Sequence, residues 1–250
     1  MPDWLMNYER YYFSASESLR LIGEYLLIDA AAAFLFFDSM SVFLIGLVGI
    51  FFYGKIRKKS FQKKRRQVLK DQFLAMITAV SGKVNGGMSA EHAFCDVISD
   101  MERMYGKNAL IVTELKLITV RQTRSETLEK CLIDLGNRSG IADIYEFAQI
   151  FSIARQNSGQ MRTVIDDTVR MMQEKRDTEA EIEVMVSGKK LEERIMCVIP
   201  LFIIGYLRLE TADFLSVLYH NPLGIFIMCI CLFVYILACF LGERIVDIRV

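Results

Sequence analysis

The stretch KIRKKSFQKKRR, residues 55–66, follows an apolar run from Val42 to Tyr53. Its eight basic residues, with no acidic one among them, are Lys55, Arg57, Lys58, Lys59, Lys63, Lys64, Arg65 and Arg66. Because Lys and Arg beside a membrane span are retained on the cytoplasmic side, we interpret the cluster as a topology anchor, compatible with contact to anionic lipid. The competing interpretation is a nucleic-acid patch, but a basic block next to an apolar run is typical of a membrane-proximal segment. The lipid bilayer, and no nucleic acid, is therefore the expected partner.

Charge is banded along the rest of the chain. The 250 residues are 53% hydrophobic, with a mean hydropathy of +0.29 and a formal net charge of +0. Residues 1–53 hold six acidic and two basic residues, residues 54–70 nine basic and none acidic, and residues 71–194 twenty acidic and sixteen basic. This segregation predicts a membrane protein that carries one soluble block of domain size.

Few residues interrupt the long helical patterns. The three prolines are Pro2, Pro200 and Pro222, and the glycines fall between periodic segments. The expected fold class is all-α, a membrane protein with a cytoplasmic six-helix bundle flanked by transmembrane helices. The expected organisation is an N-terminal region with one or two transmembrane helices (1–54), a basic cytoplasmic linker (55–70), a cytoplasmic helical bundle with a charged stalk (71–194), and two transmembrane helices with a short cytoplasmic tail (195–250).

The number of spans at the N-terminus stays open. The apolar region from Leu21 to Tyr53 is too long for one untilted span and is interrupted at Asp38, so a hairpin of two spans with its tip at Asp38 is favoured. The alternative is a single span from Ala30 to Tyr53. Glu24 and Asp29 favour the alternative, since a carboxylate at membrane depth costs about 2.5–3.5 kcal/mol, but the single span would itself bury Asp38 near its centre.

Six amphipathic helices are predicted after the basic cluster, each with apolar residues on one face at helical spacing. These faces are Phe73, Met76, Ile77, Val80 and Val84; Ala93, Phe94, Val97, Ile98 and Met101; Leu110, Ile111, Val112, Leu115 and Ile118; Leu128, Leu132 and Leu135; Ile144, Phe147, Ala148, Phe151 and Ala154; and Met161, Val164, Ile165 and Val169. Ser89 and Ser125 are expected to cap the second and fourth helices, and Asn108 to start the third. Stops are expected at Asn85-Gly86-Gly87, Gly106, Asn137 to Gly140 and Asn157-Ser158-Gly159.

The last of these helices is expected to continue as a charged stalk from Met172 to Arg194, with Lys175 and Glu179 as an i,i+4 ion pair. The stalk is interpreted either as a solvated helix or as a docking face. Beyond it, Ile195 to Leu207 is apolar over only thirteen residues, about 20 Å of helix. It needs flanking residues to span a bilayer. Leu223 to Leu241 holds nineteen residues without a charge and is the clearest span.

No catalytic constellation is recognised in the sequence. Residues 82–89 have the glycine and serine spacing of a phosphate-binding loop, but Met88 occupies the lysine position and a helix precedes the segment. The adjacent Asp166 and Asp167 diverge on a helix and are interpreted as surface charges. The two histidines and six cysteines show no metal-ligand spacing. We therefore expect no catalytic residue, cofactor or metal, and no enzyme.

The order of elements resembles a known family. After the basic-flanked span come Gly87-x-Ser89-x-x-x-Ala93, Ala154 to Gly159, Arg176 with Glu179-Ala180-Glu181, and Met196 with Pro200 at the start of a span. Over about residues 67–241 the chain resembles the type II secretion system F domain in its single-domain form, as in the TadB and TadC proteins of Flp (tight adherence) pilus assembly.

The resemblance implies an oligomeric, multi-pass platform in the cytoplasmic (inner) membrane that couples a cytoplasmic hexameric ATPase to the extraction of pilin subunits. Its implied partners are that ATPase, the pilin subunits, and a second F-domain membrane protein or further copies of this chain. The implied docking residues lie in two turns and on the stalk: Asn85, Gly87, Ser89, Asn157, Gly159, Glu174, Arg176, Glu179 and Glu181. The alternatives are a membrane-anchored sensor with a helical stalk and a small transporter.

Overall fold

A computed structural model of the chain describes residues 15–36, 49–156, 161–210 and 222–246. Over these ranges the chain forms helices and no strand, which confirms the all-α prediction. The helices are α1 (Ala15–Phe36), α3 (Ile50–Asn85), α4 (Ala90–Tyr105), α5 (Leu110–Thr123), α6 (Leu128–Ser139), α7 (Ala142–Gln156), α8 (Met161–Glu210) and α10 (Pro222–Val246). The expected hairpin tip at Asp38 and the docking residues Asn157 and Gly159 lie outside the described residues.

The described residues divide into two compact units. The first is Arg57–Asp177, which contains most of α3, all of α4 to α7 and the beginning of α8; we call it the core unit. The second takes its described residues from 15–56 and 178–246, and thus contains α1, the start of α3, the rest of α8 and α10; we call it the apolar unit. Both α3 and α8 therefore run from one unit into the other.

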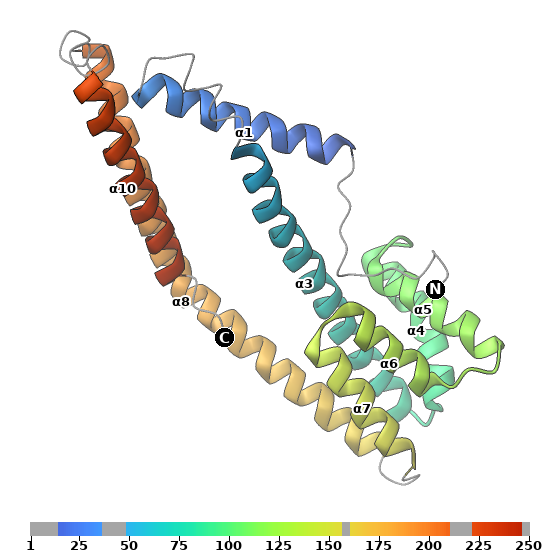
Figure 1. The fold of residues 1–250 in the computed structure, drawn as a ribbon. Coiled ribbons are helices and arrows are strands. Elements are labelled where there is room, and N and C mark those ends of the chain that lie inside the picture. Colours follow the sequence, from blue (N-terminus) through green and yellow to red (C-terminus); the bar gives the residue numbers. More distant parts are fainter. Residues whose placement is uncertain (1–14, 37–48, 157–160, 211–221, 247–250) are drawn as a thin grey trace. The chain divides into compact units, whose positions relative to one another are not determined.

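The core unit is held together by one hydrophobic core to which α3 to α8 all contribute. Figure 1 shows α4 to α7 gathered around the C-terminal half of α3 and the first part of α8. Phe147 of α7 packs edge-on against Phe73 of α3, with ring centroids 5.5 Å apart, and stacks on Phe151 at 5.9 Å. Burial of an aromatic side chain of this kind contributes about 1.5–3 kcal/mol, so these contacts fix α7 against α3.

Most residues of the apolar faces predicted from helical spacing are buried in this core, and Ile98, Leu110, Met161 and Val164 are partly buried. On α3 and α7, Phe73, Val80 and Phe147 are at most 1% exposed. The predicted start of α4 is also confirmed, because the Oγ of Ser89 accepts a hydrogen bond from the backbone N–H of His92 at 3.4 Å. Gly106 ends that helix with a φ of +86°, a conformation that favours glycine.

Ser125 was predicted to cap the fourth helix, and this prediction is wrong. The N-cap of α6 is Thr127, whose side chain makes no cap hydrogen bond. Ser125 instead adopts a φ of +66°, and its backbone N–H donates to the carbonyl of Gln122 at 3.0 Å. A residue in the left-handed region after a helix serves to stop that helix, so Ser125 belongs to the end of α5.

The start of α5 also differs from the prediction. The helix begins at Leu110 rather than at Asn108, and its N-cap residue, Ala109, has no side chain that can accept a hydrogen bond. The buried side chain of Gln72 on α3 accepts from the backbone N–H of Ile111 at 3.1 Å instead. One of the free donors at this helix start is thus satisfied by a residue distant in sequence, and such a contact has no local sequence signal.

The basic cluster forms part of a helix. It lies within α3, which runs without a break from Ile50 to Asn85 and so joins the segment expected as a linker to the first predicted apolar face. Leu69 near the end of this segment is 0% exposed, which places the beginning of the hydrophobic core inside residues 55–70.

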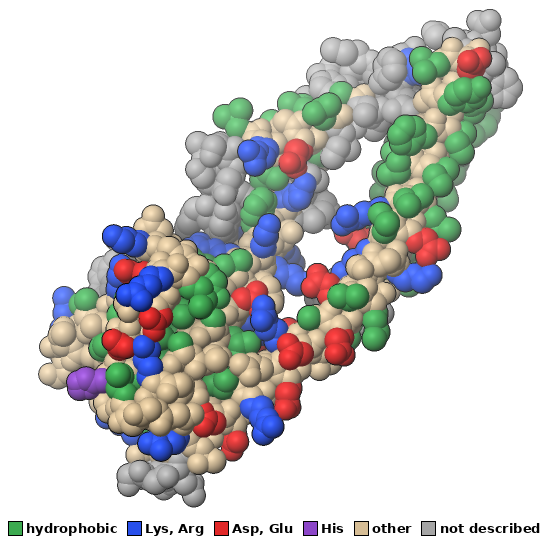
Figure 2. Space-filling model, turned by 180° about the vertical axis from the view of Figure 1, so that it is seen from behind, with side chains coloured by type: hydrophobic (Ala, Val, Ile, Leu, Met, Phe, Trp, Pro, Cys, Tyr) green, Lys and Arg blue, Asp and Glu red, His purple; other side chains and the backbone are tan. Residues whose placement is uncertain are grey.

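The apolar unit exposes large hydrophobic side chains. α8 extends over 50 residues, and the apolar segment 195–207 is its continuation, with Pro200 inside the helix. Within this unit the hydroxyl of Tyr235 on α10 donates to the backbone carbonyl of Cys197 on α8. Among the described helices, the segment Leu223–Val246, with a mean hydropathy of 2.9, is long and apolar enough to cross a membrane. Figure 2 shows hydrophobic side chains along this pair of helices.

Candidate functional site

The turn between α3 and α4 carries three of the predicted docking residues, Asn85, Gly87 and Ser89, and all three are exposed. Gly87 has a φ of +95°, and the backbone N–H of Met88 donates to the carbonyl of Lys83 at 3.1 Å, which ends α3. The turn is therefore a fixed structure that presents polar groups to solvent.

Asn85 ties this turn to the beginning of α8. Its Nδ2 donates to both carboxylate oxygens of Asp166, at 3.0 Å and 2.9 Å, and the hydroxyl of nearly buried Ser81 donates to the same carboxylate. Asp166 and Asp167 were predicted to be surface charges; Asp167 is exposed, and Asp166 is half-buried and hydrogen-bonded. The carboxylate of Asp166 joins α3 to α8 because it accepts three hydrogen bonds from two side chains of α3.

A lysine lies just before the turn and fixes α4 against α3. The Nζ of Lys83 lies 2.6 Å from Asp96 and 2.8 Å from Asp100. The hydrogen bond from Lys83 lowers the pKa of Asp96 below its ordinary value, and the hydrogen bonds to Asp100 and Asp96 raise the pKa of Lys83. These two ion pairs hold the end of α3 against the middle of α4.

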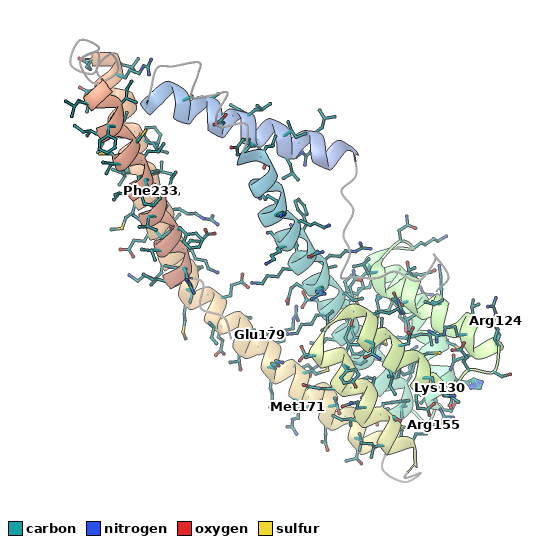
Figure 3. All side chains as sticks on the ribbon, viewed as in Figure 1. Arg124, Lys130, Arg155, Met171, Glu179 and Phe233 are labelled. Atoms are coloured by element: carbon teal, nitrogen blue, oxygen red, sulfur yellow. The ribbon has the colours of Figure 1, made fainter. Side chains whose placement is uncertain are left out.

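The charged segment of α8 holds the remaining predicted docking residues. Glu174, Arg176 and Glu181 are exposed, and Glu179 is half-buried. Arg176 lies 3.4 Å from Asp71 of α3, and Glu174 lies 3.7 Å from Arg170 one turn earlier. Figure 3 labels Glu179 on α8 beyond the part of the helix that enters the core. These side chains form a charged surface on α8, in which Glu179 is half-buried.

Lys175 was expected to pair with Glu179, but it reaches a different partner. Its Nζ lies 2.5 Å from the carboxylate of Asp143 on α7, and Lys70 of α3 lies 3.0 Å from the other oxygen of Asp143. Burial raises the pKa of Asp143, and the hydrogen bonds from Lys175 and Lys70 more than offset this, so its pKa lies below the ordinary value. The charged carboxylate thus joins α3, α7 and α8.

A buried ion-pair network was missed by the sequence reasoning. Glu114 of α5 is 1% exposed and pairs with both terminal nitrogens of Arg138 on α6, at 3.0 Å and 2.7 Å. Asp134 accepts from Arg138 at 2.8 Å and from Arg121 at 2.6 Å. The partners Glu114 and Arg138 are 24 residues apart, so helical spacing gives no signal for them.

Ion pairs also join α4, α6 and α7 at one edge of the core unit. Figure 3 shows Arg155 of α7 at this edge. Its guanidinium lies 2.6 Å from Glu91 of α4 and 2.6 Å from Glu129 of α6. These contacts stabilise the packing of α4, α6 and α7.

The basic cluster, which was predicted to be a topology anchor, lies partly in each of the two units. Lys55 lies in the apolar unit and is exposed, whereas the other seven members belong to the core unit. Of these, Lys59, Lys63 and Lys64 are exposed, and Arg57, Lys58, Arg65 and Arg66 are half-buried. Lys59, Lys63 and Arg66 line a pocket of about 420 Å³ beside Gly140 and Asp143. The cluster therefore contributes to a concave site as well as to a charged surface.

Comparison of this chain with protein families, with curated proteins and with solved structures found no match. The resemblance to the type II secretion system F domain stays a prediction. What the geometry provides is a polar turn, a charged helix surface and a basic pocket.

Proposed function

We propose that the chain is an inner-membrane platform protein of a pilus assembly or type II-like secretion machine. In this role it couples a cytoplasmic ATPase to the extraction and assembly of pilin subunits and is not itself an enzyme. The observation that carries the proposal is α8, one helix that begins in the core of the core unit and ends among exposed apolar residues.

The ends of α8 differ in what surrounds them. Ile165 and Val169 near its start are 1% and 6% exposed, whereas Phe202 and Leu209 near its end are 75% and 88% exposed. At 1.5 Å per residue, its 50 residues span about 75 Å. A continuous helix of this length can carry a displacement from a soluble domain into a membrane.

The proposal assigns the exposed apolar helices to the bilayer. Residues 195–207 of α8 and the segment Leu223–Val246 of α10 would cross the inner membrane, and the core unit would form a cytoplasmic six-helix bundle. The hydropathy of α10 and the large exposed hydrophobic residues of both helices support this assignment. The basic cluster on α3 then lies on the cytoplasmic side, as the retention of Lys and Arg requires.

The turn between α3 and α4 is the proposed contact for the ATPase, together with the charged segment of α8. Asn85 in this turn is hydrogen-bonded to Asp166 on α8, so a partner that displaces the turn acts on the start of the long helix. A second F-domain protein or further copies of this chain would complete the platform around the pilin subunits.

The experiment that tests coupling breaks α8 between its ends. A Cβ added at Gly188 would meet no heavy atom within 4 Å, so Gly188→Ala is a matched control that leaves packing unchanged. Gly188→Pro removes a helix hydrogen bond and destabilises the helix locally by about 3 kcal/mol or more. We expect Gly188→Pro to retain membrane insertion and co-purification of the ATPase but to lose pilin export, and Gly188→Ala to retain all three.

Normal pilin export by Gly188→Pro would contradict force transmission through α8. Absence of any secretion ATPase from a crosslinked, affinity-purified sample of the wild-type chain would contradict the platform function as a whole.

A further inference from the structure

Cationic side chains of α3 converge on one pocket in the core unit. From this helix the pocket is lined by the positive residues Lys59, Lys63, Arg66 and Lys70. Their spacing of four, three and four residues places them within about 60° of one another around a helix of 3.6 residues per turn. The pocket has a volume of about 420 Å³, which is enough for a small anion with its attached group.

This row of cations is unfavourable without an opposite charge. Like charges four residues apart on a helix destabilise it, and Lys59 and Lys63 form such a pair. Among the residues that the structure describes, Lys59 and Lys63 form no ion pair. A bound anion would remove the repulsion and replace it with attraction.

The opposite wall of the pocket leaves room for the cations. Gly140 has a φ of +62°, and a Cβ at this position would lie 3.0 Å from a terminal nitrogen of Arg66, so the guanidinium rests against bare backbone. Asp143 is the acidic residue of the lining, and Lys70 and Lys175 compensate its charge. The net charge facing the pocket is therefore positive.

We propose that this pocket binds a phosphate group, carried either by a soluble phosphate ester or by the headgroup of an anionic phospholipid. The planar fork of Arg66 suits phosphate oxygens, and Lys59 and Lys63 supply point charges. The backbone N–H groups of Gly140 and Ile141 donate within the chain, to the carbonyl of Gly136 at 3.2 Å and to the Oγ of Ser139 at 3.3 Å. Side-chain charges therefore provide the recognition, and salt weakens it. This binding site is independent of the proposed docking of an ATPase.

The test compares two double variants of the full chain with equal loss of charge. Lys59→Gln with Lys63→Gln removes two pocket cations, whereas Lys58→Gln with Lys64→Gln removes two lysines of the same helix that do not line the pocket. Each protein, purified in detergent, is titrated calorimetrically with inorganic phosphate and with glycerol 3-phosphate. Each is then placed in phosphatidylcholine nanodiscs with and without phosphatidylglycerol, and hydrogen exchange is measured at residues 59–70 and 140–143.

The expected result is binding or protection by at least one phosphate probe in the wild-type chain. Loss of two charge-assisted contacts should weaken phosphate binding about tenfold or more in the pocket variant. The affinity of the control variant should stay within about twofold of the wild-type affinity. Saturable binding of the soluble probes identifies a soluble phosphate ester as the ligand. Protection only in discs with phosphatidylglycerol identifies the lipid headgroup.

Equal weakening in both double variants would overturn the proposal, because it would show diffuse attraction to a basic helix rather than a pocket. Absence of binding and protection with every probe in the wild-type chain would overturn it as well. Neither outcome depends on pilin export, so this test and that of the platform function can fail separately.

Discussion

Apolar side chains of the same type are buried in the core unit and exposed in the apolar unit. Phe94, Phe147 and Phe151 of the core unit are at most 1% exposed, whereas Phe202 and Phe233 of the apolar unit are 75% and 68% exposed. In the core unit, apolar residues recur on one face of each helix and pack on other helices of the same unit. In the apolar unit they surround the helix, an arrangement typical of helices covered by lipid or by another protein.

The two units also differ in how they place charge. The core unit buries Glu114 and Asp143 against cations from other helices, whereas the pair Lys189 and Glu192 in the apolar unit is formed by neighbours on one exposed helix. The core unit thus draws its stability from its own tertiary contacts, and the apolar unit depends on what surrounds it. Substitutions of the same type should therefore have unequal effects in the two units.

The largest difference is expected for phenylalanine truncation. Phe147→Ala removes contacts to Phe73 and Phe151 and leaves a cavity, so it should lower the free energy of unfolding of the core unit by about 3–5 kcal/mol. Phe233→Ala, on exposed α10, should leave the stability of the core unit unchanged. Urea-dependent hydrogen exchange of core-unit peptides in the full chain measures both effects, and equal sensitivity would show that the two units do not unfold separately.

A smaller difference is expected for ion pairs. Glu114→Gln leaves the buried guanidinium of Arg138 with Asp134 as its carboxylate partner, and it should lower the free energy of unfolding by about 3 kcal/mol. Glu192→Gln breaks an exposed pair with Lys189 and should cause no measurable change, because solvent screens that pair. The same exchange measurement decides between them. If Glu114→Gln is neutral, the buried network contributes no stability and the contrast in charge placement has no energetic meaning.

The carboxylate of Asp143 should make the core unit sensitive to acid. Its pKa in the folded chain lies below the ordinary value of 3.8, because the hydrogen bonds from Lys175 and Lys70 outweigh the effect of burial. The stabilisation is therefore complete above the unfolded pKa and is lost as the pH falls through the lower folded pKa. Asp143→Asn should lower the free energy of unfolding by about 2 kcal/mol at pH 7 and reduce the loss of stability at acid pH. The comparison requires unfolding curves for both proteins from pH 7 down to about pH 3, and an unaltered loss of stability at acid pH in the variant would exclude Asp143 as its source.

The sequence predicted those features of the core unit that depend on neighbours along the chain. The apolar faces of α3 to α8, the Ser89 cap and the long continuation of α8 follow from helical spacing and capping chemistry. Contacts between distant residues gave no such pattern. Asp166 meets Asn85 across 81 positions, and Glu114 meets Arg138 across 24, so neither pairing has a local signature.

The predictions that were wrong have the same origin. Serine is a good N-cap residue, but Ser125 instead adopts the left-handed conformation that ends α5, so it cannot cap α6. Asn108 was expected to start α5, but the helix begins at Leu110, where Gln72 of α3 accepts from the backbone N–H of Ile111. The basic pocket could be anticipated only in part, because the row on α3 is visible in the sequence whereas its opposite wall at Gly140 depends on the fold.

The smallest expected effect separates local from tertiary stabilisation inside the core unit. Ser89→Ala removes a side-chain cap of α4 and should lower the free energy of unfolding by about 1 kcal/mol. Thr127 is the N-cap of α6 but makes no side-chain cap bond, so Thr127→Ala is the matched control, with an expected change below about 0.5 kcal/mol. Urea unfolding of the core-unit signal measures both. If both variants lose the same stability, the cap geometry is irrelevant and α4 is held only by its packing in the shared hydrophobic core, as in the contact of Phe94 with Phe151 of α7. If Ser89→Ala loses more, the side-chain cap contributes to the stability of the core unit in addition to that packing.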